Sequence, residues 1–207
     1  MVICYKYTMK PSEEQSATIS KKHIITIAGR PGSGKSTTAK KVADRLGYEH
    51  FSSGDLFREI AKKDGLDVKQ ANISAEKNSK IDQLVDERLQ EIGITQDMQV
   101  IDSRMAWHWI PQSFKVFLDL NLNIAAKRII DNFDKKRAVN ESIPLAVDAY
   151  AKELEGRLDS EKRRYKALYG VNPYSADNYD LVVDTAVNNI EQVVEIVVKE
   201  FNSWLSK

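Results

Sequence analysis

The chain has 207 residues, enough for one domain of ordinary size with a proper hydrophobic core. Its 31 basic and 30 acidic residues give a net charge of +1, which argues against a nucleic-acid motor with a strongly basic face. A single cysteine, Cys4, excludes an internal disulfide framework and a cysteine-based zinc site. No apolar stretch approaches the roughly eighteen residues of a membrane helix, and the N-terminus lacks the long apolar region of a signal peptide. We therefore expect a cytoplasmic enzyme that binds neither a membrane nor a nucleic-acid polymer.

The first 22 residues are the least informative part of the chain. Residues 1–7 are compatible with a short strand, whereas residues 10–16 are polar and typical of a solvated linker. We predict a flexible N-terminal extension over residues 1–22 and a single catalytic domain over residues 23–207.

A complete phosphate-binding motif, GxxxxGK[ST], occupies residues 29–36, which we call the phosphate loop. It follows the apolar run 24–28 and precedes the helix-compatible stretch 36–46. A strand that turns through glycines into a helix points backbone N–H groups and the positive end of the helix dipole at one spot, which favours phosphate. A glycine-rich turn followed by an accidental Lys-Ser is the alternative, but the complete motif and its context favour a nucleoside triphosphate site. The predicted ATP-binding residues are Gly29, Arg30, Pro31, Gly32, Ser33, Gly34, Lys35, Ser36 and Thr37.

Within this loop, two side chains carry specific chemistry. Lys35 is predicted to reach the β- and γ-phosphates, and the Ser36 hydroxyl is predicted to ligate Mg²⁺.

Short apolar runs alternate with longer helical patterns along the rest of the chain. Strands are predicted at residues 24–28, 48–52, 99–102, 115–119 and 180–184, and most are separated by enough residues for a crossover helix. The last helix is predicted at residues 190–205, with Ile190, Val193, Val194, Val197, Val198, Phe201, Trp204 and Leu205 on one face. These patterns predict an α/β protein, a three-layer α/β/α sandwich around a five-stranded parallel sheet. Ligands of such sheets collect beyond the carboxyl ends of the strands.

The third predicted strand ends in a carboxylate, Asp102, which has the form of an aspartate that orients Mg²⁺ through its water ligands. An aspartate that simply begins a turn is the alternative, since Asp119 and Asp184 end their strands in the same way. Arg104 follows two residues later, which places a guanidinium beside the carboxylate at the mouth of the sheet.

The second predicted strand runs into Ser52-Ser53-Gly54-Asp55-Leu56-Phe57-Arg58. We expect Gly54 to make a tight turn and Asp55 to cap the helix that follows. Arg58 would then project from the first turns of that helix and bind a phosphate bidentately. The alternative is a solvated Arg58 paired with Glu59 or another neighbour.

A late helix, predicted at residues 147–169, carries an acidic residue on its apolar face. That face comprises Val147, Tyr150, Ala151, Leu154, Leu158, Tyr165, Leu168 and Tyr169, and Glu161 falls inside it. Arg157 and Arg164 flank Glu161 at spacings of four and three. A buried, functional carboxylate is one interpretation, and an exposed Arg–Glu–Arg ladder worth a few tenths of a kcal/mol per pair is the other.

Four segments occur in a fixed order: the phosphate loop, Ser52-Ser53-Gly54-Asp55-Leu56-Phe57-Arg58-Glu59, Ile101-Asp102-Ser103-Arg104, and Ser160-Glu161-Lys162-Arg163-Arg164-Tyr165-Lys166. Ile81-Asp82, Asp86-Glu87-Arg88 and Tyr169-Gly170 add to the pattern. Together they resemble a nucleoside monophosphate kinase, most closely the short form of cytidylate kinase, from residue 22 to residue 205. The resemblance implies an adenylate-kinase-like P-loop fold with an acceptor-binding arm at about residues 56–94 and a lid at about residues 134–158.

The same resemblance implies a function and its residues. The partners are ATP and CMP or dCMP, the cofactor is Mg²⁺ held by Ser36 and Asp102, and the protein is expected to be a monomer. Catalytic residues are then Lys35, Arg104, Arg128 and Arg157, the last two acting on the transferring phosphoryl group. The residues that bind the acceptor nucleotide are Ser53, Asp55, Arg58, Arg104, Glu161 and Arg164. In the family, the acidic residue at the place of Glu161 accepts a hydrogen bond from the amino group of cytosine.

The chain departs from this family around residues 103–110. Ser103 replaces the usual glycine, and Met105 replaces the base-reading aspartate of the long form. Trp107 and Trp109 are interpreted as core residues, with stacking on a base as the alternative, and His108 is interpreted as structural. Three other functions stay open: a kinase for AMP, UMP, shikimate or dephospho-coenzyme A, a nucleotide-switched binding module, and a kinase homologue that has lost its acceptor specificity.

Overall fold

A computed structural model describes residues 21–66, 80–131 and 146–207 of the protein. Five parallel strands form one sheet in the order β2-β3-β1-β4-β5. The strands are β1 (Ile24–Gly29), β2 (Glu49–Ser52), β3 (Gln99–Asp102), β4 (Phe114–Asp119) and β5 (Leu181–Asp184). The helices are α1 (Lys35–Leu46), α2 (Ser53–Lys63), α4 (Lys80–Thr95), α5 (Ala106–Trp109), α6 (Leu122–Asp131), α8 (Val147–Tyr169), the 3₁₀ turn η1 (Ala176–Asn178) and α9 (Ile190–Leu205). The predicted α/β class and five-stranded parallel sheet are confirmed.

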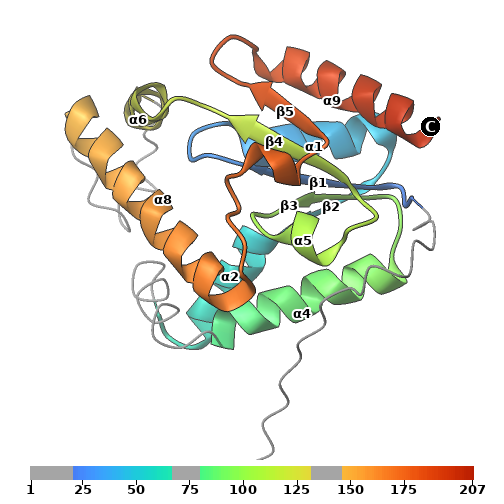
Figure 1. Cartoon of the computed structure of the whole chain (residues 1–207), viewed down its shortest axis with the longest axis horizontal. Coiled ribbons are helices and arrows are strands. Elements are labelled where there is room, and N and C mark those ends of the chain that lie inside the picture. Colours follow the sequence, from blue (N-terminus) through green and yellow to red (C-terminus); the bar gives the residue numbers. More distant parts are fainter. Residues whose placement is uncertain (1–20, 67–79, 132–145) are drawn as a thin grey trace, which may run out of the picture.

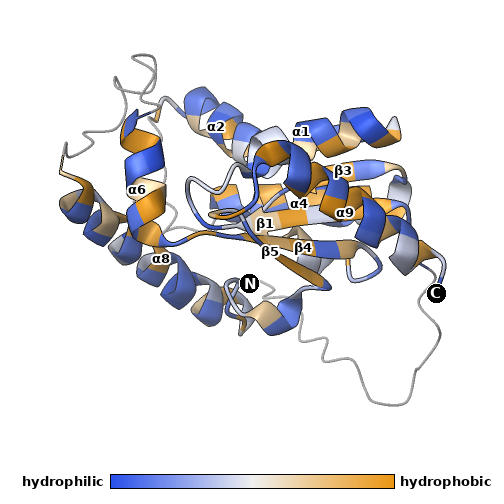
Figure 2. Ribbon diagram, turned by 90° about the horizontal axis from the view of Figure 1, so that it is seen from above, coloured by the Kyte–Doolittle hydropathy of each residue, from blue (hydrophilic) through white to orange (hydrophobic). Residues whose placement is uncertain are grey.

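Helices cover both faces of the sheet and give three layers (Figure 1), and a buried hydrophobic cluster lies on each face. Ile25 and Ile27 of β1 pack with α1 and α9, whereas Ile24 of the same strand packs with α4 and α5. Successive side chains of a strand point to opposite faces, so a strand covered on both sides is apolar throughout. Figure 2 shows this pattern: hydrophobic strands lie between helices that carry many hydrophilic residues.

Helices α2, α6 and α8 take no part in these two clusters. α2 packs on α4 through Phe57, Ile60, Ala61 and Ile81, and α6 packs on α8 beside the carboxyl ends of the strands (Figure 1). The predicted arm at about 56–94 therefore includes α2 and α4, and the described part of the predicted lid, residues 146–158, is the first half of α8. Residues 67–79 and 132–145 lie outside the described residues.

The phosphate loop leaves β1 through a backbone that only glycine tolerates. Gly29 has φ +155°, and a Cβ there would lie 2.4 Å from the carbonyl oxygen of Leu118 in the neighbouring strand β4. Gly34 caps α1 with φ 82°, so that the helix begins at Lys35. Glycine at both positions lets the loop curl over the sheet edge and aim the N-terminus of α1 at the loop's centre.

Two local expectations are wrong. Ser52, not Asp55, caps α2: its hydroxyl accepts a hydrogen bond from the Asp55 backbone N–H at 3.3 Å, and Gly54 lies within the helix rather than in a tight turn. The helix therefore begins three residues earlier than expected, because a serine at the strand end can cap as well as an aspartate. Leu168, expected on the buried face of α8, is 42% exposed because it lies at the end of the helix.

Of the predicted extension over residues 1–22, the structure describes Lys21 and Lys22. The Lys22 ammonium donates to the carbonyl oxygens of Gly93, Ile94 and Gln96 at the end of α4, at 2.7–3.1 Å. A cation at a helix C-terminus meets carbonyls that have no partner within the helix. Flexibility of residues 1–20 stays a prediction.

Substitution of Gly29 by alanine should destabilise the protein by at least about 2 kcal/mol, because alanine neither adopts this φ nor fits against Leu118. Gly156→Ala is the matched control. Gly156 is exposed in α8, and a Cβ at that position would meet no atom within 4 Å, so this change should raise the free energy of unfolding by about 0.5–1 kcal/mol. Urea unfolding of both variants checks this. Equal unfolding midpoints for Gly29→Ala and the wild type would contradict the close contact between Gly29 and Leu118.

Candidate functional site

The phosphate loop presents two cations at its two ends. The Lys35 ammonium donates to the carbonyl oxygen of Arg30 at 3.2 Å, and the Arg30 Nε atom lies 2.6 Å from a carboxylate oxygen of Asp119 at the end of β4. Burial and the nearby charge of Arg104 lower the pKa of Lys35 to about 8, although Asp102 and Glu161 oppose the shift. The ammonium form of Lys35 is thus less stable in the free protein than on a solvated lysine, and a polyanion bound in the loop would stabilise it.

Ser36 and Asp102 meet beside Lys35. The Ser36 hydroxyl, at the start of α1, donates to the Asp102 carboxylate at 2.5 Å, across the gap between α1 and the end of β3. Two adjacent oxygen groups are what Mg²⁺ usually takes from a protein, the rest of its six ligands being waters and phosphate oxygens. Among the described residues no cluster of three or more His, Cys, Asp or Glu side chains could hold a metal by itself. The residues present therefore fit a magnesium ion that arrives with a nucleotide.

Glu161 of α8 is the centre of the charged cluster. Its carboxylate lies 2.9 Å from Arg104 Nε and 3.3 Å from Arg157 Nε, and it accepts a hydrogen bond from the Tyr174 hydroxyl. The Arg104 contact is an ion pair without hydrogen-bond direction. Glu161 is 7% exposed, which confirms that it faces inward. Burial works to raise the pKa of Glu161, but Arg104, Arg157 and the Tyr174 hydrogen bond outweigh it and lower that pKa overall.

A second ion pair lies next to this centre and includes Asp82, to which sequence reasoning assigned no role. Asp82 of α4 is 8% exposed and faces Arg164 of α8 across 3.7 Å. One helical turn further on, the Asp86 carboxylate accepts hydrogen bonds from the Trp109 indole at 2.8 Å and from the Tyr169 hydroxyl. The available signal was the i, i+4 spacing of two carboxylates between the apolar residues 81, 85 and 89, which puts both on the buried face of one helix.

The aromatic segment after Arg104 is structural. Trp107 is 9% exposed, packs with Ala28 and Phe117, and donates its indole N–H to the Arg104 carbonyl at 2.8 Å. His108 lies edge-on between the rings of its two neighbouring tryptophans. Burial lowers the pKa of His108, which favours a neutral ring. Ser103 accepts a hydrogen bond from the Met105 backbone N–H at 3.2 Å, a contact that the usual glycine could not make.

Three other predicted site residues make their contacts outside the Glu161 cluster. Arg58 is paired with Asp55 at 2.5 Å on the surface of α2. Ser53 donates to the Asp102 backbone carbonyl at 3.3 Å, which brings the start of α2 to the magnesium residues. Arg128 of α6 donates to the Thr185 carbonyl at 2.7 Å, beyond the end of β5.

The structure thus brings most of the predicted site to one edge of the sheet. Lys35, Ser36, Asp102, Arg104, Arg157 and Glu161 share direct contacts or electrostatic coupling. Arg164 is coupled to the same centre. Arg58 and Arg128 stand apart, on α2 and α6, each held by another partner. The cations outnumber the carboxylates that meet them, so the edge favours an anionic ligand.

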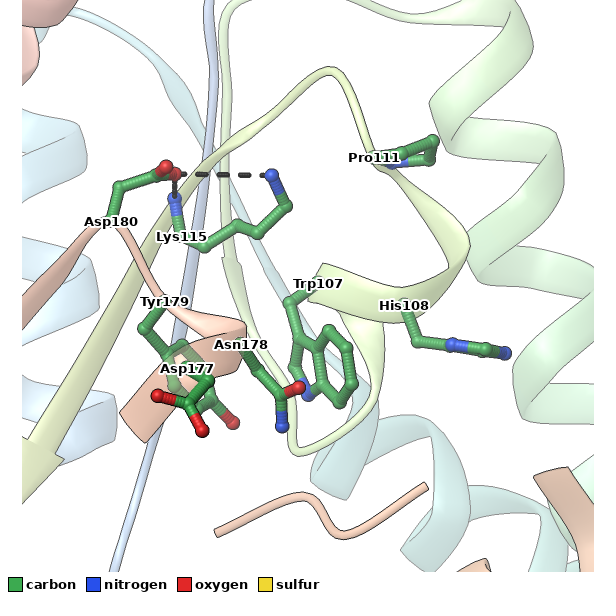
Figure 3. A pocket seen from close by; sticks show the side chains of 8 residues that line it. All are labelled: Trp107, His108, Pro111, Lys115, Asp177, Asn178, Tyr179 and Asp180. Atoms are coloured by element: carbon green, nitrogen blue, oxygen red, sulfur yellow. Dashed lines mark hydrogen bonds and ion pairs between the residues drawn. The ribbon is translucent and has the colours of Figure 1, made fainter. Parts of the chain in front are cut away.

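A shallow depression of about 410 Å³ lies elsewhere, at the amino ends of β4 and β5 (Figure 3). Trp107, His108, Lys115 and Tyr179 line it. The Asp180 carboxylate accepts a hydrogen bond from the Lys115 backbone N–H at 2.8 Å and forms an ion pair of 3.8 Å with the Lys115 ammonium. It therefore lies at the opposite end of the strands from the phosphate loop. None of the described helices is long and apolar enough to cross a membrane.

Comparison with known proteins identifies the family. A family model described as an AAA domain matches residues 28–164. The cytidylate kinase of Halobacterium salinarum is 36% identical over 184 residues, which cover 87% of this chain and 90% of that protein. The cytidylate kinase of Methanocaldococcus jannaschii is 34% identical over 84% of this chain and 94% of its own length. The chain belongs to the cytidylate kinase family. The family inferred from the sequence is thereby confirmed.

Solved structures support the fold. A shikimate kinase from Acinetobacter baumannii, in complex with shikimate, superposes with a TM-score of 0.59 over 92% of this chain and 98% of that one, at 16% identity. A gluconokinase from Sinorhizobium meliloti superposes with a TM-score of 0.58 over 90% of this chain and 95% of that one, at 13% identity. At such low identity these likenesses establish the P-loop kinase fold alone.

The Asp86 contacts predict a pH-dependent stability. Burial, opposed by the Tyr169 and Trp109 hydrogen bonds, raises the pKa of Asp86 to about 6 from the ordinary 3.8. A raised folded-state pKa means that the native protein binds this proton more tightly than the unfolded chain. The resulting stability is fully present below about pH 4 and is lost as the pH rises through 6.

Asp86→Asn should therefore gain stability relative to the wild type between pH 4 and 7, by up to about 3 kcal/mol, and then level off. The amide can accept from Trp109 and donate to the Tyr169 oxygen, so the hydrogen bonds survive. Chemical denaturation at a series of pH values measures the difference. Glu155→Gln, an exposed change on α8, should show no such rise. If the free energy of unfolding of Asp86→Asn differs from that of the wild type by the same amount at every pH, Asp86 titrates like a solvated carboxylate.

Proposed function

We propose that the protein is an ATP-dependent nucleoside monophosphate kinase that transfers the γ-phosphoryl group of ATP to CMP or dCMP. The observation that carries this is the single charged edge at which the phosphate loop, the Ser36–Asp102 pair and the arginine–Glu161 cluster meet. Membership of the cytidylate kinase family supports the acceptor nucleotide.

On the ATP side, the phosphates lie in the loop of residues 29–36 and the adjoining Thr37, against the N-terminus of α1. Lys35 reaches the β- and γ-phosphates, where a bound anion restores its ordinary affinity for a proton. Ser36 and Asp102 hold Mg²⁺, which supplies charge neutralisation at the phosphate oxygens when bound. Arg30, fixed by Asp119, closes the outer side of the loop.

On the acceptor side, Arg58 and Arg104 bind the phosphate of the nucleoside monophosphate. The other residues of this half of the site are Ser53 and Asp55 at the start of α2 and Arg164 on α8. Glu161 belongs to this half of the site as the carboxylate that sets the positions of Arg104 and Arg157. The attacking phosphate oxygen of the acceptor is already anionic, so no general base is required. This agrees with the packing of the half-buried His108 ring against the two neighbouring tryptophan rings.

Transfer itself needs positioning and positive charge rather than covalent catalysis. Arg104 and Arg157 share Glu161, so their guanidinium groups are held at one place where negative charge spreads over the transferring phosphoryl group. Arg128 joins them when α6 and α8 close over the site, which excludes water and favours transfer over hydrolysis. A monomer in the cytoplasm, with no nucleic-acid partner, completes the proposal.

A coupled assay of ADP formation tests the function directly. The panel contains CMP, dCMP, UMP, AMP and shikimate, each against ATP alone. CMP and dCMP should give the highest kcat/KM. Turnover that ignores every added acceptor would indicate a nucleotide-switched module, and a preference for shikimate would indicate another kinase of the same fold.

Lys35→Ala should lower kcat by at least roughly a hundredfold, because it removes a charge that is aimed at the transferring phosphates. The fold should persist, since burial and Arg104 already act against the charged side chain. Steady-state kinetics and thermal unfolding measure the two effects. Lys40→Ala, an exposed change on α1, is the control and should leave kcat unchanged. A kcat of Lys35→Ala close to that of the wild type would contradict the assignment of residues 29–36 as the ATP phosphate-binding loop.

Arg58→Ala should chiefly raise the KM for the acceptor, because a lost charged hydrogen bond costs about 1.5–3 kcal/mol. The Arg58 guanidinium is more than half exposed and pairs with Asp55 on the same helix, so its removal should leave the fold intact. ATP affinity of the free enzyme should barely change. Lys62→Ala on the same helix is the control. If Arg58→Ala weakens ATP binding and spares the acceptor, the two nucleotide sites are exchanged.

A further inference from the structure

Asp82 carries a buried oxygen that makes no hydrogen bond to any described residue. The residue is 8% exposed, and its Oδ2 atom has no hydrogen-bond donor among the described residues. Arg164 Nε lies 3.7 Å from this oxygen, which is beyond hydrogen-bond reach. A buried carboxylate oxygen without a donor is costly, so a chain retains one chiefly where a ligand supplies the donor.

Arg164 carries a buried hydrogen-bond donor that has no acceptor among the described residues. Its Nε–H is buried and has no hydrogen-bond acceptor among the described residues, although another guanidinium nitrogen reaches the Tyr165 hydroxyl at 3.3 Å. An open hydrogen-bond acceptor on α4 and an open donor on α8 therefore stand side by side. They lie next to Arg104 and Glu161: Asp82 is electrostatically coupled to both, and Arg164 to Glu161.

We propose, on the basis of the function proposed above, that the Asp82–Arg164 pair reads the base of the acceptor nucleotide. Asp82 Oδ2 accepts a hydrogen bond from an exocyclic amino group, and Arg164 Nε donates to the adjacent ring nitrogen. Asp82 is thus a specificity-determining residue. Glu161 is a positioning residue, because two arginines and Tyr174 already occupy its carboxylate.

The chemistry of the bases matches this pair in one direction. Cytosine presents an amino donor beside the ring acceptor N3, which fits an acceptor beside a donor. Uracil presents the carbonyl acceptor O4 beside an N3–H donor, which is the reverse order, and would leave both protein groups unpaired. Such a mismatch discriminates strongly, because the buried groups then lose their partners altogether. Adenine has the same order as cytosine, so the pair separates cytosine from uracil and the space around it must exclude purines.

The pair is also the easiest contact of the cluster to open. At 3.7 Å it is longer than the 2.9 Å and 3.3 Å ion pairs of Glu161 and has no hydrogen bond to break. It joins α4 to α8, and a base that enters between these helices exchanges a weak contact for two hydrogen bonds. The Glu161 contacts need not change.

The test compares Asp82→Asn with Glu161→Gln, two isosteric changes of neighbouring buried carboxylates. For each, kcat/KM is measured with CMP, with UMP, and with the CMP analogue that carries hydrogen in place of the amino group. Asp82→Asn should lower the ratio of kcat/KM for CMP to kcat/KM for UMP at least tenfold. Replacing the cytosine amino group by hydrogen should reduce kcat/KM far less in this variant than in the wild type. Glu161→Gln should slow both nucleotides and keep their ratio.

An Asp82→Asn variant with an unchanged ratio, or a Glu161→Gln variant that alone narrows it, would overturn the proposal. If Asp82→Asn does not fold, Arg164→Lys provides the second test. It keeps the charge but loses the fixed Nε–H, so it should no longer distinguish CMP from its 3-deaza analogue; retained discrimination counts against the pair. A wild type that phosphorylates no monophosphate would refute the proposed function itself, which separates that failure from failure of the pair.

Discussion

The buried carboxylate of Glu161 is the interaction on which the rest of the site depends. It faces Arg104 and Arg157 at 2.9 Å and 3.3 Å, in a region where burial and the repulsion from Arg104 already lower the pKa of Lys35. Without this carboxylate, the arginines would repel one another and Lys35 and would turn toward solvent. Loss of one partner from a buried ion pair typically costs about 3–5 kcal/mol, so the cluster holds only as a unit.

The same contact ties together elements that are distant in the chain. Arg104 follows β3, Glu161 lies on α8, and Tyr174 lies on the segment before η1. Substrate that binds at this edge therefore also stabilises the packing of α8 against the sheet. The clustered cations of the site repel one another in the free protein and attract phosphate groups. The same charges therefore lower the stability of the free protein and favour binding of its ligands.

Sequence alone was sufficient for features whose cause is local. The strands are short apolar runs with polar ends, and the phosphate loop needs only glycines followed by Lys35 and Ser36. Glu161 was found because an acidic residue inside an apolar helical stripe breaks the usual pattern. The cap of α2 was missed because Ser52 and Asp55 are both good caps, and only the backbone path of β2 decides between them.

The features that sequence could not supply are those that two distant helices make jointly. Asp82 and Asp86 are four residues apart on α4, where two like charges destabilise an isolated helix. Their arrangement is favourable only because α8 places Arg164 and Tyr169 opposite them. Asp86 accepts two hydrogen bonds, whereas the buried Asp82 oxygen faces a guanidinium at 3.7 Å and accepts no hydrogen bond within the described part of the chain. That difference depends on the angle between α4 and α8, which no local pattern records, and it distinguishes the structural carboxylate from the one we assign to the base.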